Sequence, residues 1–223
     1  MLDDDGFEWM RQVVPQATIA ELITESQRLS DLEPGATQGI RDLLQKSSII
    51  RSLTHASWIR NCVPTSLVCV RGILFDKNPN ANWLVAWHQD LTICVQKQRD
   101  VPGFGPWSVK HGVPHVQPPI ALLESMVTAR IHLDDTNAAN GALHVLPGSH
   151  LEGRLRSEAI EAWRGRNSPV CCEAMSGDVL LMKPLLLHAS SKAESPAHRR
   201  IIHLEFAPPQ GLAPELSWYE SSL

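Results

Sequence analysis

The sequence reads Trp-His-Gln-Asp at residues 87–90, and the other candidate functional residues can be interpreted from this stretch. In a β-strand, alternate side chains point to one face, so a strand here would place His88 and Asp90 together. An imidazole and a carboxylate on one face can bind the same metal ion. His188, far downstream, could add a second imidazole, and two histidines with one carboxylate form the facial triad of non-haem Fe(II) oxygenases. Arg199, eleven residues after His188, can supply a fixed positive charge for a carboxylate cosubstrate.

Two other pairs compete for the role of metal ligands. His132 and Asp134 have the same spacing, and His203 and Glu205 have it with a glutamate. Spacing alone does not reject either pair. Asp134 borders an Asp-Thr-Asn turn, where an aspartate is commonly a turn or cap residue. His203 shares a strand with Arg199, which favours a role in a cavity wall or in packing.

The order of the expected elements indicates the fold class. Apolar stripes predict helices near residues 18–29 and 39–60, the second divided at Ser47-Ser48. Short β-type runs follow at residues 66–75, 83–95, 126–133, 179–187 and 199–206. The Pro- and Gly-rich stretch 99–119 is expected to be either a lid over a site or a surface connection. Helices followed by many short strands predict a mainly β sandwich or barrel with helices on one side.

Residues 126–133 alternate between an apolar face and a face that carries Thr128, Arg130 and His132. In a barrel with a polar interior, the second face would line the cavity. A charged Arg130 there requires a partner. Glu205 could neutralise it, or Arg130 could bind an anionic group of the substrate, with Arg71 and Trp107 as further candidate substrate contacts. Trp83 and Trp87 are expected to alternate away from His88 and to pack under the sheet.

Length and composition are those of one globular domain. The chain has 223 residues, 43% hydrophobic and 20% charged, and a formal net charge of −4. We expect one domain over 1–223, with a helical layer at 1–62, a core at 63–207 and a tail at 208–223. The charge and the lack of a basic cluster argue against nucleic-acid binding. The acidic start and the lack of a long apolar run predict a cytoplasmic protein without a membrane span. Five cysteines without a CxxC pair are expected to be reduced thiols.

A set of short motifs, in this order, resembles the phytanoyl-CoA dioxygenase family of Fe(II)/2-oxoglutarate oxygenases. The set comprises Asp5-Gly6-Phe7, the stretch 87–90, Asn140-Gly141-Ala142-Leu143, Leu146-Pro147-Gly148-Ser149-His150, Gly177-Asp178-Val179-Leu180-Leu181, His188-Ala189-Ser190 and Arg199. The resemblance implies a double-stranded β-helix, a jelly roll of the cupin type. It also implies His88, Asp90 and His188 as catalytic metal ligands, with Arg199 and Ser190 binding the distal carboxylate of 2-oxoglutarate.

The same resemblance implies Fe(II), 2-oxoglutarate and O2 as cofactor and cosubstrates. The expected reaction is hydroxylation of a small-molecule metabolite with release of succinate and CO2. Related halogenases have a small residue in place of the carboxylate, so Asp90 favours hydroxylation or desaturation. Two alternatives remain: a metal-dependent jelly-roll enzyme that does not use 2-oxoglutarate, such as a cupin-like isomerase or an O2-only dioxygenase, and a non-catalytic binding module.

Overall fold

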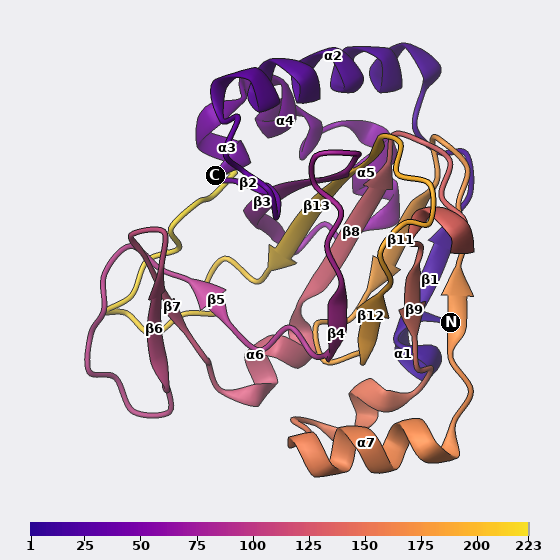
Figure 1. Ribbon diagram of the computed structural model, residues 1–223. Helices are drawn as coiled ribbons and strands as arrows, with labels where there is room; N and C mark the ends of the chain where they lie inside the picture. The colour runs from indigo at the N-terminus through magenta and orange to yellow at the C-terminus, as the bar shows by residue number, and fades with distance from the viewer. Residues whose placement is uncertain (223) are drawn as a thin grey trace.

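Two antiparallel sheets face each other in the computed structural model, which describes residues 1–222 (Figure 1). The larger sheet has six strands in the order β1 (Phe7–Met10), β11 (Val179–Met182), β8 (Val127–His132), β13 (Arg199–Ala207), β3 (Val68–Lys77), β2 (Ile40–Arg41). The smaller sheet has four, in the order β10 (Val170–Cys172), β9 (Leu143–Val145), β12 (His188–Ser190), β4 (Val85–His88). This is a jelly roll, as the family resemblance implies.

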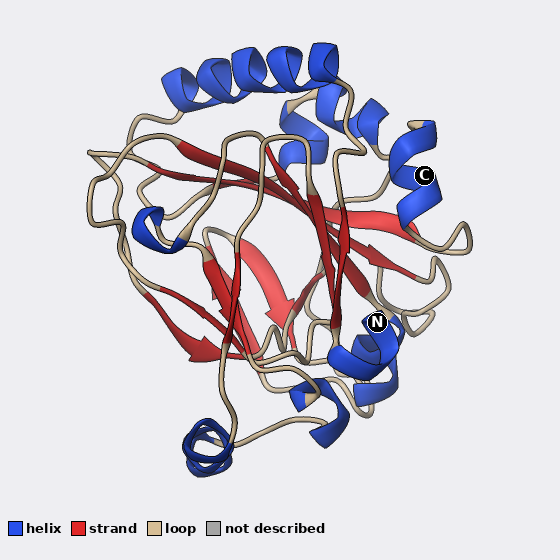
Figure 2. Cartoon of the chain, turned by 90° about the vertical axis from the view of Figure 1, so that its right-hand side faces the viewer, coloured by secondary structure: helices blue, strands red, loops and turns tan. Residues whose placement is uncertain are grey.

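Four helices cover the outer face of the larger sheet: α2 (Gln16–Leu32), α3 (Leu43–Lys46), α4 (Ser48–Leu53) and α5 (Ser57–Cys62) (Figures 1 and 2). Leu22 and Leu43 are fully buried in one apolar cluster with Ala129 and Ile131 of β8. Full burial of such a Leu or Ile side chain contributes roughly 1.5–3 kcal/mol. The apolar face predicted for residues 126–133 therefore packs under the helices, and the face with Arg130 turns inward.

Smaller elements close the ends of the jelly roll. A third sheet has the order β5 (Ile93–Cys94), β7 (Val113–Val116), β6 (Trp107–Lys110). The remaining helices are α1 (Leu2–Asp5), α6 (Ile120–Ser125), α7 (Ser157–Arg166) and the 3-10 turns η1 (Ala138–Asn140) and η2 (Ser149–Glu152). Across residues 1–222, no helix combines the length and the apolar character that crossing a bilayer requires.

Several element boundaries differ from those expected. The helical region expected to begin at residue 39 starts with the short edge strand β2, which pairs Arg41 with Ile73. The division at Ser47 is confirmed, because its hydroxyl caps α4 by accepting the Ile50 N–H at 3.1 Å. The strand expected at 83–95 breaks after His88, and the strand expected at 179–187 breaks after Met182. In both cases the break comes at a loop beside the metal centre described below.

Candidate metal centre

His88 and His188 lie directly opposite each other on the neighbouring strands β4 and β12. Their ring centroids are 4.2 Å apart. Asp90 lies two residues beyond the end of β4, with Oδ1 3.7 Å from His88 Nε2 and Oδ2 3.7 Å from His188 Nε2. The three donor atoms all lie within 4.8 Å of one another, so they could hold one metal ion.

Backbone carbonyls fix both imidazoles in the orientation that a metal ligand needs. His88 Nδ1 lies 2.8 Å from the Ala86 carbonyl oxygen, and His188 Nδ1 lies 2.9 Å from that of Leu186. Because a carbonyl only accepts, each Nδ1 carries the proton and each Nε2 presents its lone pair toward Asp90. Partners of this kind typically set the tautomer of a metal-bound histidine.

Gln89 explains how Asp90 reaches the site although the strand ends at His88. The Gln89 side chain donates to the carbonyls of Gly153 and Leu185, each at 2.7 Å. Its carbonyl oxygen accepts the Leu155 N–H at 2.8 Å. The Asp90 N–H donates to the Pro184 carbonyl at 2.8 Å. These bonds fix the loop after β4 and turn the Asp90 carboxylate toward the histidines.

The electrostatics of Asp90 and His188 suit metal binding. Burial by itself raises the pKa of Asp90, but the neighbouring His188 and His88 outweigh it and hold that pKa well below its usual range. Burial lowers the pKa of His188 to about 4, although Asp90 opposes this shift. The site therefore holds an ionised carboxylate and a neutral His188 near pH 7, which are the forms that bind metal ions.

A cavity of about 590 Å³ opens in front of the three donors, between the facing sides of the two sheets. Ser190, Arg199, Arg130 and Arg71, which the sequence suggested as binding residues, line it with the triad. Trp107 does not line it, because β6 places this ring against an apolar cluster of the third sheet.

The two tryptophans near the triad lie on different sides of β4. Trp87 turns away from His88, as expected, and Arg164 of α7 lies 5.8 Å from its ring centroid. Trp83 lines the cavity instead of packing under the sheet, so that expectation is wrong. Trp83 lies before β4 begins, so the alternation of side chains along that strand does not determine its direction.

Arg199 lies next to a buried lysine that the sequence reasoning missed. Arg199 is 3% exposed and donates to the Gly141 carbonyl at 2.7 Å, while its Nε has no partner within residues 1–222. Lys77 is 0% exposed and donates to Ser190 Oγ and to the Ser191 carbonyl. No carboxylate among residues 1–222 forms an ion pair with either cation.

The charge of this cluster suits a bound carboxylate. Burial, and after it the positive charges of Arg199 and Arg130, lower the pKa of Lys77 to about 7. Burial and Arg130 lower the pKa of Arg199 to about 9. Buried cations without a counterion are costly, and an anion bound at Ser190 and Arg199 would offset that cost.

Arg130 and Arg71 differ in how their charges are compensated. Arg71 forms an ion pair with Glu205 at 3.0 Å. Among the described residues, the hydrogen-bond partner of Arg130 is His203 Nδ1, at 3.1 Å, and its Nε has none. The expectation that Glu205 neutralises Arg130 is therefore wrong, because Glu205 pairs with Arg71 across β13 and β3.

The competing ligand pairs are engaged elsewhere. Asp134 forms hydrogen bonds with the Arg200 guanidinium at 2.6 and 2.8 Å, and His132 Nδ1 lies 3.0 Å from Thr136 Oγ1. His203 and Glu205 form part of the cavity wall, 3.4 Å apart. In residues 1–222, the only His/Cys/Asp/Glu group with a metal-binding arrangement is His88, Asp90 and His188.

The fold and these donors define a jelly-roll protein with one candidate metal centre. A profile of the phytanoyl-CoA dioxygenase (PhyH) family matches residues 2–201. The chain therefore belongs to the phytanoyl-CoA dioxygenase family. No curated protein matches the sequence significantly.

Solved structures share the fold at low sequence identity. AviO1 from Streptomyces viridochromogenes Tue57 is 22% identical with a TM-score of 0.69, over 95% of this chain and 94% of that one. The epimerase SnoN, in complex with Fe3+, alpha ketoglutarate and nogalamycin RO, is 18% identical with a TM-score of 0.68, over 92% and 80%. HygX from Streptomyces hygroscopicus, with nickel and 2-oxoglutarate bound, is 19% identical with a TM-score of 0.64, over 94% and 85%. Family membership and these neighbours support an enzyme that uses iron and 2-oxoglutarate.

Proposed function

We propose that this chain is an Fe(II)- and 2-oxoglutarate-dependent oxygenase that hydroxylates a small-molecule metabolite and releases succinate and CO2. One observation carries the proposal: the three candidate ligands share a cavity with the uncompensated cations Arg199 and Lys77. A metal alone would need only the three ligands. The cations add a carboxylate-binding site at one side of the same cavity, as a dicarboxylate cosubstrate requires.

Each residue of the candidate site has a specific role in the proposed reaction. His88, Asp90 and His188 would hold Fe(II), which supplies the oxidative chemistry when it is bound together with 2-oxoglutarate and O2. Arg199 and Ser190 would bind the distal carboxylate of 2-oxoglutarate and so fix the orientation of its keto acid end. The facing sheets limit the access of water to the cavity, which strengthens these charge interactions.

Arg130 is the candidate contact for an anionic group of the substrate near the metal. It is 6% exposed, it lines the cavity, and no carboxylate among the described residues pairs with it. Arg71 is the weaker candidate, since Glu205 already compensates its charge. Both assignments concern the substrate and leave the assignment of the cosubstrate site unchanged.

The epimerase SnoN is a neighbour with the same fold, so the outcome of the oxidation has to be tested separately from the cofactors. The first test supplies the purified chain with Fe(II), 2-oxoglutarate and O2 and measures slow succinate formation without substrate. Bound metal without succinate would favour an enzyme that does not use 2-oxoglutarate. Absence of metal binding would favour a non-catalytic module. A metabolite panel scored by substrate-stimulated succinate yield, with product mass, then separates hydroxylation (+16 Da, one oxygen atom gained) from other oxidations.

A further inference from the structure

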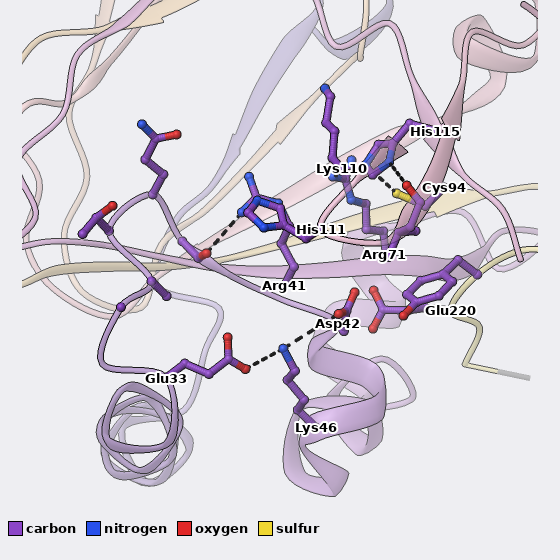
Figure 3. Close-up of a pocket in the computed structure, with 17 residues that line it drawn as sticks. Glu33, Arg41, Asp42, Lys46, Arg71, Cys94, Lys110, His111, His115 and Glu220 are labelled. Atoms are coloured by element: carbon purple, nitrogen blue, oxygen red, sulfur yellow. Dashed lines mark hydrogen bonds and ion pairs between the residues drawn. The ribbon is translucent and has the colours of Figure 1, made fainter. Parts of the chain in front are cut away.

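A second cavity of about 440 Å³ lies next to the metal cavity. Figure 3 shows the residues that line it. It lies among β2, the hairpin β6–β7 and the C-terminal segment that carries Tyr219 and Glu220. Four residues line both this cavity and the metal cavity: Gln38, Arg41, Arg71 and Lys110. Because these four residues line both cavities, the two cavities are adjacent.

The acidic side chains of the second cavity are already engaged. Glu33 lies 2.5 Å from Lys46 Nζ, and Asp42 lies 3.8 Å from it (Figure 3). The Glu220 carboxylate accepts two backbone N–H groups, at 2.8 and 3.0 Å. Burial raises the pKa of Glu220 to about 7, so its charge is also reduced near neutral pH. Within residues 1–222, none of these acids forms an ion pair with the cations shared with the metal cavity.

Arg41 and Lys110 are the cations that remain. The Arg41 guanidinium donates only to the Gly39 carbonyl, at 3.2 Å, and neither Arg41 nor Lys110 forms an ion pair with any residue from 1 to 222. Arg41 is half-buried, and burial together with the positive charge of Arg71 lowers its pKa, although Asp42 opposes this shift. A half-buried guanidinium with a second cation nearby and no counterion has a positive potential that an anion can offset.

The hairpin β6–β7 fixes the position of Lys110. Lys110 pairs with Val113, and the two residues between them have positive φ, 50° at His111 and 79° at Gly112. This is the backbone of a tight two-residue hairpin turn, which holds the adjacent strand ends in a fixed register. His111 lines the same cavity and can add a hydrogen-bond donor.

We propose that the second cavity binds an oxyanion, a phosphate or a carboxylate, at the far end of the substrate that reacts at the metal centre. Arg41 supplies a planar fork of donors and Lys110 a point charge, a combination that suits tetrahedral and planar oxyanions. The substrate class is then a metabolite with a terminal acidic group separated from its oxidised carbon. The inference rests on the proposed function for the reaction, and its binding step can be measured without turnover.

Calorimetry on the full chain loaded with Ni(II) and 2-oxoglutarate tests the site, because 2-oxoglutarate then fills the anion site at Arg199. The titrants are inorganic phosphate and acetate, which separate the two oxyanion types. Arg41→Gln and Lys110→Gln should each weaken binding of the preferred anion at least about tenfold, the loss of one charge-assisted hydrogen bond. Arg41→Lys should lose part of this affinity, since it keeps the charge but lacks the fork. Arg166→Gln, the same charge change on the distant helix α7, is the matched control and should shift the affinity less than twofold.

The proposal is overturned if neither anion binds, or if Arg166→Gln weakens binding as much as Arg41→Gln. Lys110 is exposed, so its variant tests the site even if Arg41→Gln fails to fold.

A second experiment measures KM for pairs of substrates: phosphate esters with their alcohols, and carboxylic acids with their methyl esters. The anionic member of each pair should have the lower KM. Wild-type succinate formation without anion binding would refute this inference alone. Binding that depends on Arg41, without succinate formation, would refute the proposed function alone.

Discussion

Arg199 and Lys77 are direct cross-strand partners: they occupy the same register position on β13 and β3, and both side chains are buried. Like charges opposite each other in a sheet destabilise it, and no acid among residues 1–222 pairs with either. The fold thus retains an electrostatic cost at the position where the cosubstrate carboxylate is proposed to bind. Sites that bind anions commonly carry such a cost, because the ligand removes it.

Replacing Lys77 by Met should separate the destabilisation caused by its buried charge from its contribution to 2-oxoglutarate binding. Met keeps most of the side-chain volume and removes the buried charge, so the melting temperature without 2-oxoglutarate should rise. The increase in melting temperature on adding 2-oxoglutarate should shrink, and the Kd for 2-oxoglutarate should rise about tenfold, as for the loss of a charged hydrogen bond. Thermal unfolding with and without 2-oxoglutarate measures both effects. A lower melting temperature with an unchanged shift on adding 2-oxoglutarate would mean that Lys77 is structural only.

Binding of 2-oxoglutarate should depend on pH through Lys77. In the unliganded protein its pKa is lowered from 10.5 to about 7, by burial first and then by Arg199 and Arg130. A carboxylate bound beside it favours the ammonium form, so the pKa in the complex is higher. Affinity should therefore be highest below about pH 7 and fall as pH rises above 7, by at most about tenfold per pH unit.

The stability of the unliganded protein should have the opposite dependence. The unfolded chain binds more protons at Lys77 between about pH 7 and 10.5, so this group makes stability rise with pH in that window.

Calorimetric titrations of 2-oxoglutarate into the Ni(II)-loaded chain from pH 7 to 9 test the pH dependence of the affinity. Lys77→Met should flatten the profile, and an equal slope in wild type and variant would assign the proton to another group.

Arg199→Ala should raise the KM for 2-oxoglutarate about ten- to hundredfold or more, because the bonds to its distal carboxylate are worth roughly 1.5–3 kcal/mol each. The substrate KM should change far less. Arg200→Ala is the matched control on the next residue, whose side chain pairs with Asp134 at 2.6 Å on the other face of β13. An unchanged KM for 2-oxoglutarate in Arg199→Ala would refute this assignment.

Alanine at His88, Asp90 or His188 should abolish iron binding and turnover while the fold is retained, since each variant removes one of three ligands. His132→Ala should retain iron, because His132 Nδ1 contacts Thr136 and the Asp134 carboxylate binds Arg200. Iron content per chain after gel filtration is the measurement. Iron loss in His132→Ala with retention in His88→Ala would mean that the other pair binds the metal.

The sequence predicts the parts of this site that depend on local periodicity. The alternation of residues 126–133 predicts both which face packs under the helices and that Arg130 turns inward. Asp90 reaches the triad by a different route from the one expected. The strand ends at His88, and the bonds of Gln89 rather than strand alternation turn Asp90 toward the histidines.

The roles of Lys77 and Arg41 depend on strand pairing that local periodicity does not contain. The run of β-type residues ends at Phe75, yet pairing with β13 extends β3 to Lys77. Lys77 is an even number of residues from Arg71 on the same strand, so both side chains point to one face. This alternation is the signal that could have placed Lys77 on the inner face. Arg41 belongs to a two-residue strand defined only by its pairing with β3, so its residues fitted a helical stripe equally well. Trp107 lies in the stretch 99–119, expected to be either a lid or a surface connection, but its hairpin β6–β7 packs on its own apolar cluster.

Arg130→Gln should weaken substrate binding more than 2-oxoglutarate binding. Arg130 is buried in the cavity wall, with His203 as its hydrogen-bond partner and the ring of Phe75 centred 5.8 Å away. Burial lowers the pKa of Arg130 to about 10, while Asp90 opposes this shift. When Asp90 binds a metal ion, its charge no longer compensates Arg130, so an anionic group of the substrate becomes the available partner.

With a carboxylate substrate, Arg130→Gln should raise the substrate KM about tenfold or more. With the corresponding methyl ester it should change KM little. The ratio of the two KM values, with the 2-oxoglutarate KM as internal reference, is the measurement. If acid and ester respond alike, Arg130 has a structural role and the anionic contact lies elsewhere in the cavity.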